Sequence, residues 1–286
     1  MTSDANELPR LAPRAAESHK GDYGRAVLVG GSRGMSGAIA LAGMAALRAG
    51  AGLVTVAVPE VCLETVASFD PCLMTVPLPC DAAGRLAADA APALRGLAER
   101  ATVMACGPGL GRSPHVTQLV RDLYTSVPLP LVVDADGLNA LAEQPGGLAS
   151  VGGPRIITPH PGEFRRLSGM AERDAAGQQA CAQELARTHQ ITVVLKGHRT
   201  LITDGGRSVR NTTGNAGMAT GGAGDVLTGI LAALLGQGLS VWDAARLGVH
   251  LHGLAGDIAA RQLTQLALTA QDLLRFLPQA WKELGY

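Results

Sequence analysis

Residues 211–235, NTTGNAGMATGGAGDVLTGILAALL, decide how the rest of the chain is interpreted. The first half is almost entirely small and polar, and its five glycines let the backbone turn tightly. From Asp225 onward apolar residues recur at helical spacing, so we expect a helix to begin near Gly224 or Asp225. A glycine-rich loop that enters a helix is an anion-binding site, because the first backbone N–H groups are free and the helix dipole favours negative charge.

Asp225 is the unusual residue of this stretch. As an N-cap it would only stabilise the helix. Beside a bound phosphate its carboxylate would be repelled, unless it had a chemical task such as taking the proton of an attacking group. The stretch therefore indicates either a capped helix or a phosphoryl-transfer site.

The composition is that of a globular protein. The chain has 286 residues, of which 47% are hydrophobic and 17% charged, and its net charge is zero. The charge balance gives no reason to expect a nucleic acid or an anionic membrane as partner. The longest apolar runs are about half of the ~20 residues that a membrane-spanning helix needs. Five cysteines without C-x-x-C spacing, and an N-terminus unlike a signal peptide, predict a cytoplasmic protein with reduced thiols.

Strands alternate with helices along the chain. Apolar β-branched runs predict strands at 25–30, 53–58, 73–76, 102–106, 129–134, 155–158 and 192–196, with a hairpin of 201–203 and 208–210. Helical patterns cover 36–49, 61–68, 86–100, 114–124, 136–143, 162–167, 174–188, the central helix, 241–263 and 269–277. This order predicts a mostly parallel sheet with helices on both faces. We expect an arm over 1–18 and a single domain over 19–286.

Ligands of such folds bind outside the carboxyl ends of the strands. The corners at these ends are GGSRGMSG (30–37), GPGLG (107–111), DADGLNAL (134–141), TPHPGEF (158–164), KGHRT (196–200) and NAGMATGGAGD (215–225). All six carry glycines, and together they could line one crevice.

Each corner has a structural alternative. GGSRGMSG lacks the G-x-G-x-x-G spacing of a dinucleotide fingerprint, and GPGLG could be a simple tight turn. Asp134 and Asp136 either cap the next helix or suit Mg²⁺ through water. His160 lies between two prolines in an extended loop, which favours a ligand contact over a core position. Lys196 either reaches solvent or contacts phosphate.

The motifs of other site classes are absent from the sequence. There is no P-loop G-x-x-x-x-G-K-[ST] and no G-x-S-x-G elbow. The remaining histidines show no metal-ligand spacing, so we assign no metal-ligating residue. The loop before Asp225 is then the remaining place to hold nucleotide phosphates.

These residues carry a resemblance. GAGD entering an apolar helix resembles the ribokinase-like superfamily. The blocks VLVGGSRGMSGA, ALRAGAGLVTV, GPGLG, VVDADGLNAL, ITPHPGEF, VVLKGHRTLI and GNAGMATGGAGDVLTGILAALLGQG, in this order, are similar to the NAD(P)H-hydrate dehydratase family over about residues 20–280. Ala216 and Ala223 stand where the family commonly has proline and serine, at loop positions whose backbone matters more than their side chains.

The resemblance implies a ribokinase-like three-layer sandwich and a nicotinamide-nucleotide repair enzyme. The substrate would be the S epimer of hydrated NADH or NADPH. ADP, or ATP in eukaryotic members, would be consumed in the presence of Mg²⁺, and with ADP the products would be NAD(P)H, AMP and phosphate. The family precedent is a homotetramer. The family's frequent epimerase domain is not in this sequence, so a separate epimerase would act on the same substrate.

The resemblance also implies residue roles. Asp225 would accept the proton of the attacking hydroxyl, and the helix dipole would keep its carboxylate ionised. The residues expected to bind the nucleotide are Lys196, Gly197, His198, Arg199, Thr200, Gly222, Ala223 and Gly224. The residues expected to contact the hydrated dinucleotide are Ala40, Gly109, Gly111, His160 and Asp225. Mg²⁺ would bridge phosphate oxygens.

Two other functions stay open. A small-molecule kinase of the same superfamily, of the thiazole or pyrimidine type, would use the same Asp225 chemistry and stop at a phosphorylated product. A non-catalytic nucleotide-binding protein would share the fold, but it would have no need of an acid beside phosphate. The identity of the product distinguishes the three.

Overall fold

The computed structural model describes residues 7–143, 148–169 and 174–286, and the strands in these residues form one sheet. Its strands are β1 (Arg25–Val29), β2 (Leu53–Pro59), β3 (Met74–Leu78), β4 (Val103–Cys106), β5 (Leu131–Val133), β6 (Arg155–Ile157), β7 (Thr192–Leu195), β8 (Leu201–Thr203) and β9 (Ser208–Arg210). Their order across the sheet is β3-β2-β1-β4-β5-β6-β7-β8-β9. Strands β1 to β7 pair in parallel, whereas β8 and β9 pair antiparallel. The expected mostly parallel sheet is confirmed.

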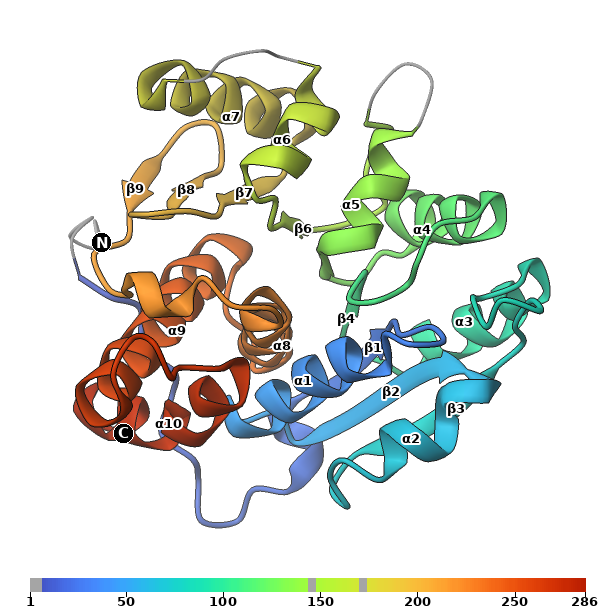
Figure 1. Ribbon diagram of the computed structural model, residues 1–286, viewed down its shortest axis with the longest axis horizontal. Helices are drawn as coiled ribbons and strands as arrows, with labels where there is room; N and C mark the ends of the chain where they lie inside the picture. Colours follow the sequence, from blue (N-terminus) through green and yellow to red (C-terminus); the bar gives the residue numbers. More distant parts are fainter. Residues whose placement is uncertain (1–6, 144–147, 170–173) are drawn as a thin grey trace.

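Two helical layers cover the sheet, which crosses Figure 1 diagonally between them. One layer consists of α1 (Ser36–Arg48), α2 (Leu63–Ala67), α8 (Ala223–Gly236), α9 (Val241–Leu263) and α10 (Ala270–Glu283). The other consists of α3 (Ala91–Ala98), α4 (Pro114–Ser126), α5 (Ala135–Ala142), α6 (Pro161–Ser168) and α7 (Ala175–His189). The architecture is therefore a three-layer α/β sandwich.

The period of a β-strand explains why both faces of the sheet are buried. In β1, Ala26 and Leu28 pack in the core that contains α8, and Val27 and Val29 pack in the opposite core. Successive side chains of a strand point to opposite faces, so an almost continuous apolar run is buried on both sides. This is why the sequence showed runs of apolar residues rather than strict alternation.

The C-terminal helix is longer than expected. We expected it to end at residue 277, but α10 continues through Pro278 to Glu283. Proline normally disfavours a helix interior because it lacks an N–H and crowds the preceding turn. Ala280, beyond the proline, is fully buried, and the Trp281 indole N–H donates to the carbonyl of Arg48 at 3.2 Å. Packing against α1 therefore outweighs the local preference.

The N-terminal segment contacts the C-terminal residue and the turn after α1. The N–H of Leu11 donates to the hydroxyl of Tyr286 at 2.7 Å, and the guanidinium of Arg14 donates to the carbonyl of Gly50 at 2.7 Å. Residues 1–6 of the expected arm are outside the described residues. Among the helices that the structure describes, none has the length and apolar character to cross a membrane.

Candidate active site

The N-terminus of α8 is open toward the carboxyl ends of the central strands. The helix begins at Ala223, one residue before the expected start, with Gly222 as its N-cap. Gly222 has φ +88°, and a Cβ there would lie 2.6 Å from Leu41 Cδ1, so only glycine fits this turn. Within the described residues, the N–H groups of Gly224 and Asp225 donate to no backbone acceptor. They are available to an anion, as the sequence predicted.

Lys196 lies beneath this helix end. Its Nζ is 2.6 Å from Asp134 Oδ1 and 3.9 Å from Glu163 Oε2, and a Cβ on Gly224 would lie only 3.2 Å from the same Nζ. The Lys196 side chain is 21% exposed, so it is largely buried but still accessible from the site. Burial alone would lower the pKa of Lys196, but the carboxylates of Asp134 and Glu163 raise the pKa above its usual value. The ammonium is thus a fixed positive charge at the anion site.

Asp134 connects three elements at the floor of the site. It follows β5 and is only 1% exposed. Its carboxylate accepts from Lys196 Nζ and, at 2.8 Å, from the hydroxyl of Thr228 on α8. The capping alternative is wrong for this side chain, because Asp134 occupies the N-cap position of α5 without accepting a capping hydrogen bond from it. Asp134 instead fixes Lys196 against α8.

The carboxyl group of Asp225 has a strongly raised pKa. Burial, followed by repulsion from Asp134, raises the pKa of Asp225 to about 7, and Lys196 only partly opposes the rise. Desolvation thus outweighs the helix dipole, and the carboxylate that we expected to stay ionised is only partly ionised at neutral pH. A carboxylate with a pKa near 7 is a stronger base than an ordinary aspartate, and this suits it to general-base catalysis.

The GPGLG corner is held by Asp136. The N–H of Gly111 donates to Asp136 Oδ2 at 2.9 Å, and the carbonyl of Gly109 accepts from Ser32 Oγ at 2.8 Å. Both glycines have positive φ, +66° at Gly109 and +71° at Gly111, so the corner needs glycine at these positions. Asp136 also raises the pKa of Asp225, after burial and Asp134.

His160 is the N-cap of α6, and its ring is half exposed at the site. Its Nδ1 accepts from the N–H of Gly162 at 2.9 Å, while Glu163 completes a capping box by accepting from the N–H of His160 at 2.8 Å. The sequence interpretation missed Glu163, although an acidic residue three positions after a helix cap is a recognisable signal. Nearly buried at the edge of the site, Glu163 also contributes to the rise in the pKa of Asp225, as the last of its causes.

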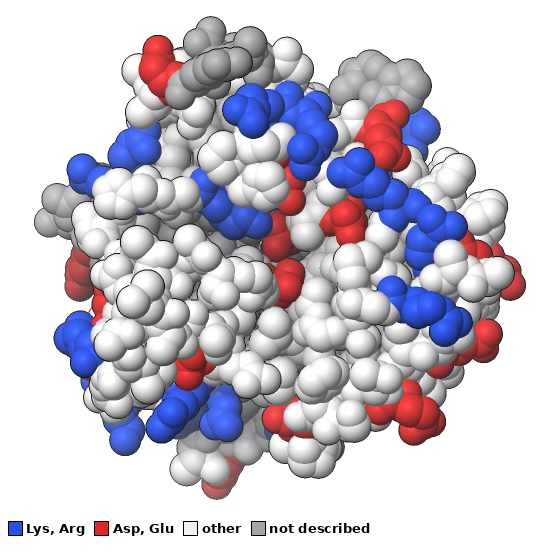
Figure 2. Space-filling model, in the orientation of Figure 1, with Lys and Arg blue, Asp and Glu red and all other residues white. Residues whose placement is uncertain are grey.

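A pocket of about 790 Å³ opens beside these groups. It lies between the 196–200 segment, the 211–220 loop, the start of α8 and helix α9. The predicted nucleotide-binding residues in its lining are Lys196, Gly197, His198, Arg199, Thr200, Ala223 and Gly224. Gly222 caps the helix without lining the pocket, and His160 lies at the pocket's edge toward α6. Figure 2 shows acidic side chains in a hollow on this face, with Lys and Arg side chains gathered around it.

The residues predicted to contact the dinucleotide are less closely grouped. Gly109 and Gly111 lie at the GPGLG corner and His160 at the pocket edge, but Ala40 is completely buried in α1. Ala40 therefore offers no accessible surface in this conformation, and its contact with substrate stays a prediction. His252, which sequence patterns did not single out, lines the pocket from α9 and donates from Nε2 to the carbonyl of Ala223 at 2.9 Å.

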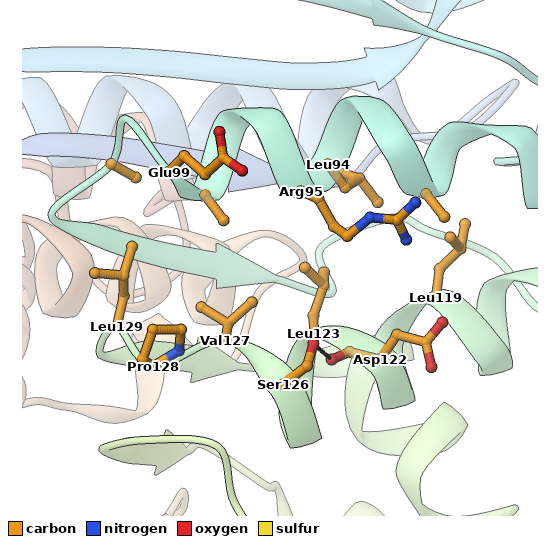
Figure 3. A pocket seen from close by; sticks show the side chains of 13 residues that line it. Leu94, Arg95, Glu99, Leu119, Asp122, Leu123, Ser126, Val127, Pro128 and Leu129 are labelled. Atoms are coloured by element: carbon orange, nitrogen blue, oxygen red, sulfur yellow. Dashed lines mark hydrogen bonds between the residues drawn. The ribbon is translucent and has the colours of Figure 1, made fainter.

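A second pocket, of about 640 Å³, lies between α3 and α4 (Figure 3). It is next to the amino ends of β4 and β5, at the opposite edge of the sheet, and leucines cover much of its wall. It contains none of the residues predicted to act. The chemistry is therefore assigned to the pocket beside α8.

The site carries donors that suit an anionic ligand. Among the described residues, no group of three or more His, Cys, Asp and Glu side chains could hold a metal ion by itself. The free N–H groups of α8 and the Lys196 ammonium would instead stabilise a phosphoryl group. Asp225, with its pKa of about 7, would accept a proton from the group that attacks it.

Comparison with known proteins agrees with this geometry. The family model described as NAD(P)H-hydrate dehydratase matches residues 26–279. The bifunctional NAD(P)H-hydrate repair enzyme Nnr of Moorella thermoacetica is 50% identical over 282 residues, which cover 98% of this chain and 52% of that protein. This chain thus spans about half the length of the curated relatives it matches.

Two solved structures show the same fold over nearly the whole chain. The ADP/ATP-dependent NAD(P)H-hydrate dehydratase of Bacillus subtilis, co-crystallised with ATP and Mg²⁺, has a TM-score of 0.81 at 33% identity and covers 96% of this chain and 94% of its own. A ribokinase-like superfamily protein of Enterococcus faecalis also has a TM-score of 0.81, at 30% identity, with coverages of 96% and 92%. The three-layer sandwich is therefore ribokinase-like.

Proposed function

Because this chain belongs to the NAD(P)H-hydrate dehydratase family, we propose that it restores NAD(P)H from the S epimer of its hydrate at the expense of ADP or ATP. The observation that supports this activity most directly is the position of Asp225. Its carboxylate has a pKa of about 7 and belongs to the first turn of α8, where Gly224 lies against Lys196. A protein that only bound a nucleotide would have no need of a proton acceptor there.

The reaction has two stages. The hydroxyl oxygen of the hydrate attacks the terminal phosphorus of the nucleotide while Asp225 takes the hydroxyl proton. A new O–P bond forms, and the bond to the leaving nucleotide breaks. The lone pair of the ring nitrogen then expels phosphate with its C–O bonding electrons, and loss of a proton from the neighbouring carbon forms the ring double bond. With ADP, the products are NAD(P)H, phosphate and AMP.

The protein's contribution to phosphoryl transfer is positioning and charge stabilisation. The free N–H groups of Gly224 and Asp225, together with the Lys196 ammonium, face the position of the transferred group. The predicted ligands from the 196–200 segment hold the remainder of the nucleotide in the 790 Å³ pocket. The hydrate lies on the other side of Asp225, toward His160 and the GPGLG corner.

Mg²⁺ fits this site as an ion that arrives with the nucleotide. The ion commonly keeps several waters and binds through one or two carboxylates plus phosphate oxygens. The described residues lack a complete cation site of their own, but Asp134 and Glu163 stand at its floor around Lys196. These carboxylates would hold the water ligands of the ion. Bound there, Mg²⁺ would neutralise charge on the phosphates.

The cellular setting follows from the same family membership. We infer a cytoplasmic protein, a homotetramer, and an epimerase activity that interconverts the two hydrate epimers. Bifunctional relatives named for NAD(P)H-hydrate repair support a link between the two activities. The single sheet that runs from β3 to β9 supports treating residues 19–286 as one domain.

Conversion of the hydrate tests the proposal. Wild-type protein with Mg²⁺ and either ADP or ATP should restore reduced-nicotinamide absorbance from the S hydrate and release phosphate in equal amount. The Asp225→Asn variant should lose turnover while its nucleotide affinity stays within about threefold of wild type, because the carboxylate acts on the attacking group. Phosphorylation of a thiazole or pyrimidine alcohol with no hydrate conversion would instead favour the kinase alternative.

A further inference from the structure

We propose that Asp257 of α9 is a positioning residue that fixes the nucleotide-facing loop, residues 211–218, in its binding conformation. The inference rests on the proposed binding of an adenine nucleotide in the pocket beside α8. Asp257 is not among the residues that line this pocket, so it would act on the nucleotide only through the loop.

Both carboxylate oxygens of Asp257 are used by the loop. Oδ2 accepts from the N–H of Gly214 at 2.8 Å, and Oδ1 accepts from the side-chain amide of Asn215 at 2.9 Å. Gly214 and Asn215 themselves line the pocket. Gly214 has φ +100°, a conformation that side chains rarely adopt, and its N–H would lose its acceptor if Asp257 were removed.

Asn215 links Asp257 to the turn that precedes α8. While its amide nitrogen donates to Asp257, its Oδ1 accepts from the N–H of Gly217 at 3.0 Å and caps the turn Ala216–Met218. The capped turn includes Ala216 and Met218, two further residues of the pocket lining. The orientation of one side-chain amide therefore sets the wall of the pocket over several residues.

Other residues of α9 also contact this loop closely. The hydroxyl of Thr213 donates to the carbonyl of His250 at 2.9 Å, one turn before the helix reaches Gly253. A Cβ at Gly253 would collide with Thr213, and one at Gly256 would collide with Met218. Glycine in a helix interior is less stabilising than alanine. The presence of these two glycines on the side that contacts the loop is explained by the close approach they allow.

Fixing this loop should matter for nucleotide affinity. If only a fraction of the molecules hold the loop in its binding conformation, the apparent dissociation constant rises by the inverse of that fraction. In Asp257→Asn one oxygen still accepts from Gly214, but the new amide nitrogen faces the amide nitrogen of Asn215, and two donors repel. We expect the affinity for ADP and ATP to fall about tenfold.

A reciprocal exchange tests the geometry apart from the charge. The double variant Asn215→Asp/Asp257→Asn restores a donor opposite an acceptor and leaves an oxygen for Gly217 and one for Gly214. It should recover the affinity to within about threefold of wild type. The matched control is Glu283→Gln, the same acid-to-amide change in a residue that pairs with Arg261 of α9 on the surface, away from the loop.

The measurement is calorimetric titration of each folded variant with Mg²⁺-ADP and Mg²⁺-ATP, with thermal melting to verify folding. Weak binding by Asp257→Asn, recovery in the double variant and wild-type binding by Glu283→Gln support the inference. Thr213→Val, which removes a different anchor to α9, should weaken binding about threefold and provides the test if Asp257→Asn does not fold. Unchanged binding in either variant, or no recovery in the double variant, overturns the inference. Failure of the wild type to bind either nucleotide would overturn the proposed function itself.

Discussion

Lys196 Nζ lies 2.6 Å from Asp134 Oδ1, and this pair joins the end of β7 to the end of β5 directly beneath the N-terminus of α8. Asp134 is 1% exposed and receives a second hydrogen bond from Thr228. The Lys196 ammonium provides a positive charge at the N-terminus of α8, and the ion pair with Asp134 holds it in place. An incoming phosphate would therefore meet an ammonium whose position is fixed before binding.

Replacing Lys196 by methionine should destabilise the fold and weaken nucleotide binding. The substitution leaves the buried carboxylate of Asp134 without its cation, and breaking a buried pair in this way costs about 3–5 kcal/mol. Urea unfolding at neutral pH measures the loss. In the double variant Lys196→Met/Asp134→Asn the uncompensated charge is gone, so the loss should be smaller than for Lys196→Met alone. Lys282→Met, an exposed lysine on α10, is the control and should change stability by less than about 0.5 kcal/mol.

The activity should rise with pH through the pKa of Asp225. The protonated carboxyl cannot accept the hydroxyl proton, so kcat/KM should be low below about pH 7, where the carboxyl is protonated, and level off above it. A pH profile of hydrate conversion under subsaturating substrate measures this limb. A flat profile between pH 5 and 9 would contradict the assignment of Asp225 as the base.

The same shift has a consequence for stability. The folded state holds the Asp225 proton more tightly than the unfolded state, because the folded pKa is about 7 and the unfolded value is that of an ordinary aspartate. The ionised group thus destabilises the fold progressively as pH rises from about 4 to about 7. Asp225→Asn, which cannot ionise, should melt at a higher temperature than wild type at pH 8, and the difference should shrink toward pH 5. Equal melting temperatures at pH 8 would show that burial does not penalise this carboxylate.

How much could be predicted from the sequence depends on whether the signal is local. The apolar runs predicted the strands, and the glycine-rich stretch before Asp225 predicted the open helix end, because both follow from neighbouring residues. The partners of Lys196 could not be predicted in this way. Asp134 and Glu163 reach it from separate corners, and only the packed sheet brings them together.

The protonation of Asp225 and the end of α10 show the same limit. The helix dipole is a local effect and favoured an ionised carboxylate, whereas the burial that opposes it comes from the whole fold. Pro278 is a local stop signal, yet α10 continues because Ala280 and Trp281 gain contacts in the tertiary structure. Roles in substrate binding, such as that predicted for Ala40, need the ligand itself.

His252 should help to position the start of α8 without titrating. Its Nε2 donates to the carbonyl of Ala223, and burial lowers the pKa of His252 to about 4, so the ring is neutral in the working range. His252→Ala should reduce kcat about tenfold through loss of this contact, whereas His252→Gln, which offers an N–H at a similar reach, should recover most of the rate. The activity limb near pH 7 should persist in His252→Gln. Its disappearance would transfer the limb from Asp225 to this histidine.

Arg155 should be the largest single contributor to stability outside the site. It is fully buried, and its guanidinium donates to the carbonyls of Tyr124 and Val127 at the end of α4, and to that of Leu129 before β5. Burial lowers the pKa of Arg155 to about 10, but it stays charged at neutral pH and satisfies these carbonyls. Arg155→Met leaves several buried acceptors unpaired and should reduce the free energy of unfolding by about 3 kcal/mol or more.

Lysine cannot replace Arg155, because the guanidinium donates several hydrogen bonds in different directions. A single ammonium cannot reach carbonyls on α4 and before β5 at once, so Arg155→Lys should also be destabilised, by about 2 kcal/mol or more. Arg95→Met provides the control: Arg95 is an exposed arginine at the nearby pocket of Figure 3, and its loss should cost less than about 0.5 kcal/mol. Nucleotide affinity should be unchanged in folded Arg155→Lys, because Arg155 lies at the amino end of β6, on the opposite edge of the sheet from the site. Equal stability losses in Arg155→Met and Arg95→Met would contradict the prediction, because they would show that the buried hydrogen bonds of Arg155 do not hold α4 against β5.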